Sequence, residues 1–80
     1  MMNSRGKQSR KDVLAAIVTL SEETGIPPTL REIGGHTRLS LAGTQYLVDS
    51  MMAEGMVTYQ RGHGRTLVVT PRGMRFLASR

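Results

Sequence analysis

The segment from Thr24 to Gly55 constrains the fold of this 80-residue chain more than any other part of it. Pro27 and Pro28 stop any helix that precedes them, because proline lacks a backbone N–H and its ring clashes with the preceding turn. Capping and apolar residues then predict a short helix over residues 30–36, a tight turn, and a second helix over residues 41–54. Two short helices joined by a tight turn form a helix-turn-helix arrangement.

Each of the two helices carries its own start signal. Thr29 is a favourable N-cap, and Glu32 three positions later completes a capping-box pattern. Ser40 is the corresponding N-cap of the second helix, and we expect Leu39 before it to plug the turn into the core. The positions expected to be buried are Leu30 and Ile33 in the first helix, and Thr44, Leu47, Val48, Met51 and Met52 in the second.

Two adjacent glycines, Gly34 and Gly35, lie in the first of these helices. Each weakens a helix by about 1 kcal/mol relative to alanine, so their presence requires a structural reason. We expect them to let the next helix approach closely. A phosphate-binding loop is less favoured, because no strand precedes the pair.

The N-terminal residues 1–9 are polar and basic and show no periodicity, which predicts a flexible basic arm. Such an arm either has no role or enters the minor groove of DNA. Ser9 can cap a helix that begins near Arg10 and ends at Gly25, so residues 10–80 are expected to form one domain. The apolar face of this helix consists of Val13, Leu14, Ile17, Val18 and Leu20.

A short hairpin and a last helix are predicted after Gly55. Residues 56–60 alternate in polarity and residues 66–70 are rich in β-branched side chains, so both are predicted strands around the loop R-G-H-G-R. Thr70 and Pro71 can open a last short helix. The predicted fold class is therefore α+β: a winged helix-turn-helix, with a three-helix bundle, a two-stranded β-hairpin wing and a short C-terminal helix.

The net charge of +5, from 11 basic and 6 acidic residues, is unevenly distributed. Residues 1–11 and 56–80 contain basic side chains and no acidic ones, whereas all the acidic residues lie between them. Basic ends around a near-neutral centre favour a polyanionic partner, here double-stranded DNA. Arginine outnumbers lysine nine to two, which suits phosphate and guanine recognition, although a GC-rich genome produces the same ratio.

Other classes of function lack the residues that they need. The chain has no cysteine, and two histidines are too few for a metal centre, so we expect no metal and no cofactor. No Ser/His/Asp set is credible in a chain this small, so we expect no enzyme. The apolar runs are too short to span a bilayer and no signal segment is present. The sequence thus predicts a cytoplasmic, nucleoid-associated protein of a bacterial, archaeal or phage-infected cell.

The strings P-P-T-L-R-E-I, R-L-S and A-E-G-M-V occur in an order that resembles the winged-helix DNA-binding domain of LexA-type repressors, over residues 10–70. The string V-T-P-R-G-M-R-F-L is more similar to the MarR group, where such a segment follows the wing. The resemblance implies a DNA-binding transcriptional repressor that occupies an operator. The self-cleaving protease domain of LexA-type proteins is absent from these 80 residues, so we expect no protease function.

Two positions depart from the LexA pattern. Arg38 stands where the turn usually has glycine, so it either strains the turn or presents its side chain toward the DNA backbone. The string A-G-T-Q-Y at residues 42–46 does not copy the base-reading residues, so the operator is not inherited from the resemblance.

In the winged-helix geometry the second helix of the motif enters the major groove by its N-terminal half. Gln45 can pair with adenine there, Tyr46 can contact a phosphate, and Asp49 repels phosphate. The start of the first helix can bind a phosphate, and the thin cationic hairpin tip can lie in a minor groove. The candidate DNA-binding residues are Thr29, Arg31, Arg38, Ser40, Ala42, Gly43, Gln45, Tyr46, Arg61, His63, Gly64 and Arg65.

Two other functions stay open at this point. A winged helix can also dock another regulator or polymerase, and a basic one can bind nucleic acid without sequence preference as an architectural protein. A homodimer on a palindromic site would double the base contacts. Its predicted surface is the last helix, with Met74, Phe76 and Leu77, which otherwise packs onto the first helix of the same chain.

Overall fold

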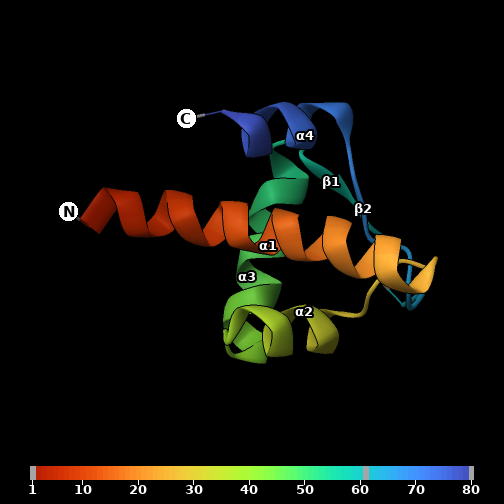
Figure 1. Ribbon diagram of the computed structural model, residues 1–80. Helices are drawn as coiled ribbons and strands as arrows, with labels where there is room; N and C mark the ends of the chain where they lie inside the picture. The colour runs from red at the N-terminus through yellow and green to blue at the C-terminus, as the bar shows by residue number, and fades with distance from the viewer. Residues whose placement is uncertain (1, 61, 80) are drawn as a thin grey trace.

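The computed structural model describes residues 2–60 and 62–79, with side chains from residue 8 onward, and this part of the chain forms four helices and a hairpin (Figure 1). The elements in chain order are α1 (Met2–Thr24), α2 (Leu30–Thr37), α3 (Leu41–Ala53), β1 (Val57–Thr58), β2 (Val68–Val69) and α4 (Pro71–Ala78). The two strands are antiparallel, with Val57 opposite Val69 and Thr58 opposite Val68. This arrangement confirms the predicted α+β winged-helix fold. Within the described residues, no helix combines the length and apolarity that crossing a membrane requires.

Helix α1 starts earlier than predicted. It begins at Met2, so the predicted start near Arg10 is wrong and Ser9 lies inside the helix instead of capping it. Residues 2–9 contain no proline, and Arg5, Lys7 and Gln8 among them are favourable helix formers. Gln8 Nε2 also donates to Asp12 Oδ1 at 2.8 Å, one turn along the helix. Binding of DNA by residues 1–9 stays a prediction.

The core lies around α1. Figure 1 shows α1 crossing α3, with α2 and α4 on opposite sides of it. Thr44 is buried among apolar side chains, and its hydroxyl donates to the carbonyl oxygen of Ser40 at 2.9 Å, so no polar group there is left unpaired. The fully buried apolar residues are Val13, Leu14, Ala16, Ile17, Ile33, Val48, Met51, Val57 and Leu67. The core is therefore aliphatic, with one fully buried methionine among the described residues.

Only one of the two adjacent glycines has the predicted packing role. A Cβ atom added at Gly34 would lie 3.1 Å from the carbonyl oxygen of Leu39 and 3.2 Å from Thr44 Oγ1, so glycine lets the start of α3 come close. A Cβ at Gly35 would meet no described atom within 4 Å. The prediction is confirmed for Gly34 and wrong for Gly35, which lies on the exposed side of α2.

The two strands are shorter than predicted, at two residues each. Beyond them the Thr66 side chain replaces the regular backbone ladder: the Gln60 N–H donates to Thr66 Oγ1 at 2.9 Å, and the Thr66 hydroxyl lies 3.1 Å from the His63 carbonyl oxygen. The predicted alternation of the first strand is confirmed, because Val57 is buried and Thr58 is exposed. The wing thus leaves the core on a short root.

Helix α4 returns the chain to the core through the predicted Thr70 N-cap. The Thr70 hydroxyl accepts the Gly73 N–H at 3.0 Å and donates to the Gly55 carbonyl oxygen at 2.6 Å. A Cβ at Gly73 would lie 2.2 Å from the carbonyl oxygen of Met56. Only glycine permits α4 to lie this close to Met56, the residue before β1, and this packing fixes the base of the wing.

Candidate nucleic-acid interface

The start of α2 is held by the predicted capping box. Thr29 Oγ1 accepts the Glu32 N–H at 3.1 Å, and Glu32 Oε1 accepts the Thr29 N–H at 2.9 Å. The Thr29 N–H bond, followed by the bond from Arg65, holds the pKa of the Glu32 carboxyl below its ordinary value. An internal carboxylate therefore already occupies part of the positive end of this helix. Arg31 is exposed in the same first turn.

The first half of α3 has one exposed face. Ser40 Oγ accepts the Gly43 N–H at 3.0 Å, which confirms the predicted N-cap. Ala42 is exposed beside the cap, and Leu41 and Tyr46 are 46% and 70% exposed. Tyr46 is therefore a surface residue and not part of the core. A helix start with small and aromatic exposed side chains has the shape that a groove of DNA accepts.

Gln45 and Asp49 form a pair one turn apart on α3. Gln45 Nε2 donates to Asp49 Oδ1 at 3.0 Å, and both side chains are partly buried. An amide carries two N–H groups, so this bond orients the side chain and leaves a second N–H and the amide oxygen for a base edge. Asp49 thus positions Gln45, a role that the sequence does not predict.

Arg38 has the backbone conformation that glycine favours. Its φ of 66° and ψ of 27° lie in the left-handed region, and it is the C-cap residue of α2. The next N–H, that of Leu39, donates to the Gly34 carbonyl oxygen at 3.1 Å and closes the helix end. The positive φ supports the first predicted alternative, strain in the turn. The exposed side chain is also compatible with the second, in which Arg38 faces the DNA backbone.

The positive charge of Arg65 in the wing is already paired within the domain. Arg65, in the left-handed region at φ 61°, donates to Glu32 Oε1, Glu32 Oε2 and the Pro27 carbonyl oxygen, each at 3.2 Å. His63 and Gly64 are exposed. Arg61, the other predicted arginine of the wing tip, lies outside the described residues.

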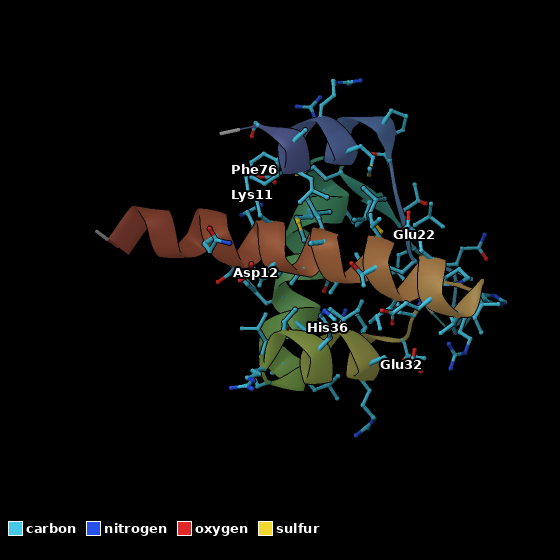
Figure 2. The ribbon with its side chains drawn as sticks, viewed as in Figure 1. Lys11, Asp12, Glu22, Glu32, His36 and Phe76 are labelled. Carbon is cyan, nitrogen blue, oxygen red and sulfur yellow. The ribbon has the colours of Figure 1, made fainter. Side chains whose placement is uncertain are left out.

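A cleft of about 240 Å³ lies between the starts of α2 and α3 and the wing. Four of the predicted contact residues line it together: Thr29, Arg31, Gly64 and Arg65. Leu41 lines it as well, although the sequence interpretation did not include it. Leu41 is apolar but is not among the α3 positions expected to be buried, and this was the signal in the sequence that could have identified it. Figure 2 shows Glu32 at this end of the molecule, at the start of α2.

The basic residues at the start of the domain have internal partners. Arg10 pairs with Glu54, and its Nη2 donates to Ser50 Oγ at 2.9 Å. Lys11 lies over the Phe76 ring, 5.8 Å from its centre, and donates to the Ser79 carbonyl oxygen at the end of α4 (Figure 2). These two charges connect α1 to α3 and α4.

The predicted dimer surface on α4 is divided. Phe76 and Leu77 pack against the chain's own core, whereas Met74 is 44% exposed. Met74 lines an apolar groove of about 320 Å³ together with residues of α1, the α1–α2 loop and β2, among them Ile26 and Val68. The packing of α4 onto the same chain is therefore confirmed for Phe76 and Leu77.

Comparison with known proteins agrees with this fold. No family model matches the chain. The chain is 37% identical over 79 residues to the LexA repressor of Lacticaseibacillus casei (strain BL23), an alignment that covers 95% of this chain and 38% of that repressor. It is 40% identical over 58 residues to the LexA repressor of Geotalea uraniireducens (strain Rf4), covering 71% of this chain and 29% of that repressor.

The chain thus spans less than half of the length of these relatives, 38% and 29% respectively. The similarity extends over the capped helix pair, the turn and the hairpin that the structure describes. The similarity of the segment after the wing to the MarR group stays a prediction. The chain is a LexA-like winged-helix domain.

Proposed function

We propose that this domain binds double-stranded DNA with the start of α3 in the major groove. The proposal is supported by the exposed face at the start of α3, where the N-cap Ser40 and the small residues Ala42 and Gly43 allow close approach to bases. Gln45, oriented by Asp49, reads an adenine, and Tyr46 contacts sugar or phosphate beside it. Those of these positions that meet base edges supply the sequence preference, whereas the Tyr46 contact adds affinity.

The cleft beside α3 is the observation that carries the proposal. It brings Thr29, Arg31 and the wing residue Gly64 to the same side as the start of α3, where the backbone of a bound duplex passes. Arg38 at the α2–α3 turn and the wing residues Arg61 and His63 extend the contacts along the phosphates. Such contacts set affinity and make it dependent on salt, whereas the α3 residues set specificity.

We further propose that the protein is a transcriptional repressor that acts by operator occupancy, without a catalytic step. The proposal follows from the similarity of the chain to LexA repressors. A homodimer on a palindromic operator doubles the base contacts. Its C-terminal contribution is Met74 more than Phe76 or Leu77, since Met74 is the exposed one of the three. The place of action is the cytoplasm, at the nucleoid.

Fluorescence anisotropy with a duplex obtained by selection tests the proposal. Gln45→Ala is expected to relax preference at one base pair, by about 1–3 kcal/mol of lost discrimination. Arg31→Ala is expected to weaken binding to all duplexes alike and to lower the salt slope by about one. Arg75→Ala, on α4 at the side of α1 opposite α2, is the matched charge control and should leave the slope unchanged.

A salt-independent affinity, or a loss in Gln45→Ala that is equal for every sequence, would contradict the proposed DNA interface. The first result would favour docking to another protein, and the second would favour sequence-independent binding.

A further inference from the structure

The wing is held to the helix-turn-helix by a contact between residues far apart in the chain. Arg65 in the wing forms a two-pronged ion pair with Glu32 of α2, with both oxygen distances at 3.2 Å, and also donates to the Pro27 carbonyl oxygen. We name this contact, formed by Arg65, Glu32 and Pro27, the wing latch. A planar guanidinium is suited to such a fork, because its N–H groups match the two carboxylate oxygens in one plane.

Among the described residues, the wing has few other restraints near its tip. Its strands end at Thr58 and begin again at Val68, and Gly62 takes a φ of 83° in the tip. The Thr66 hydroxyl bridges the two sides at the root. Arg65 itself keeps a left-handed conformation that a residue with a Cβ adopts at a cost, so its side-chain bonds are what hold it in this place.

Two possible roles for Arg65 predict opposite effects on DNA binding when the Glu32 carboxylate is removed. If the Arg65 guanidinium binds a phosphate directly, Glu32 competes for it and adds a repelling charge, so removal of the carboxylate strengthens DNA binding. If Arg65 instead holds the wing, Glu32 is the anchor and its removal weakens DNA binding. The bidentate geometry and the third bond to Pro27 favour the second role.

We infer that Arg65 is a positioning residue, which locks the wing to the start of α2 so that the wing and α3 approach the duplex in a fixed relative orientation. The inference rests on the proposed DNA-binding function for its consequence, but the latch itself is a property of the free protein. It assigns phosphate contact in this region to Arg31 and the wing tip, and not to Arg65.

Three variants test the latch. Glu32→Gln keeps an acceptor for the Thr29 N–H, so the capping box survives while the charge that holds Arg65 is lost. Arg65→Lys keeps the positive charge but loses the fork. Glu54→Gln removes a carboxylate that is also paired with an arginine, Arg10, at the end of α3, and it controls for the general effect of one acidic charge on DNA affinity.

Two readouts are measured. One is anisotropy with the selected duplex. The other is amide hydrogen exchange in the free protein at Gln60, whose N–H is bonded across the wing to Thr66, and at His63, whose N–H closes the turn onto the Gln60 carbonyl oxygen. We expect Glu32→Gln to weaken DNA binding about threefold relative to Glu54→Gln, and Arg65→Lys, which keeps the charge, to weaken it about threefold relative to the wild type. Both should speed wing exchange, and the double variant should be no weaker than either. Glu54→Gln should leave wing exchange unchanged.

The inference is overturned if Glu32→Gln binds DNA as tightly as Glu54→Gln or more tightly, even when wing exchange changes. Unchanged wing exchange in both latch variants overturns it as well. If the wild-type chain binds no duplex, the proposed function fails, and the exchange measurement in the free protein still decides whether the latch orders the wing.

Discussion

Replacement of Arg38 by glycine is predicted to stabilise the domain through the backbone alone. The residue is exposed and lies at φ 66° and ψ 27°, so its side chain contributes little packing. A Cβ in the left-handed region costs roughly 1–2 kcal/mol. Glycine avoids this cost but gives the unfolded chain about 0.4–1 kcal/mol of extra freedom. The expected net gain in the free energy of unfolding is therefore about 1 kcal/mol.

Arg38→Ala is the matched control, because it removes the same guanidinium and keeps the Cβ. Urea denaturation followed by circular dichroism should place Arg38→Gly about 1 kcal/mol above Arg38→Ala, and thermal melts should separate them by roughly 4–8 °C in a domain of this size. Equal stability of the two variants would refute the backbone argument. If Arg38 contacts a phosphate, both variants should lose DNA affinity equally, because both lack the guanidinium. The effect on DNA binding is then distinguished from the effect on stability, which differs between the two variants.

Three further predictions concern packing and charge. Gly35→Ala should stabilise the domain by about 0.5–1 kcal/mol, whereas Gly34→Ala, whose Cβ would lie 3.1 Å from a carbonyl oxygen, should destabilise it by about 1–3 kcal/mol in urea denaturation; equal effects would show the packing account to be wrong. Gly73→Ala, with a Cβ 2.2 Å from a backbone oxygen, should cost about 3 kcal/mol or more, and a wild-type melting temperature would contradict this. The folded-state pKa of Glu32 is lowered, chiefly by the Thr29 N–H, so its ionised form stabilises the fold above the unfolded pKa and this contribution is lost as pH falls through the folded pKa. Glu32→Gln should therefore show a smaller loss of stability on acidification than the wild type, and identical pH profiles would argue against it.

Local signals were sufficient to predict most of the helical framework. Thr29, Ser40 and Thr70 each accept a backbone N–H three residues ahead, as their positions before apolar segments predict. Gly25 ends α1 in the left-handed conformation, as its place after the last helical turn predicts. Caps and helix ends depend on neighbours in the chain, which is why the sequence alone reveals them.

Features that depend on distant contacts were not predictable in this way. The ion pair between Arg65 and Glu32 joins residues 33 positions apart, and no local spacing marks it. The internal bonds of Arg10 and Lys11 likewise join α1 to α3 and α4, so their charges looked free in the sequence. For the same reason, the contrast between Gly34 and Gly35 appears only once α3 is in place.

The central claim is that this LexA-like domain recognises duplex DNA by sequence. Selection of bound duplexes from a random double-stranded pool at near-physiological salt, with the 80-residue chain, tests it most directly. The account predicts an enriched motif that contains an adenine dependent on Gln45. Recovery of unselected sequence by a protein shown to be folded would contradict it.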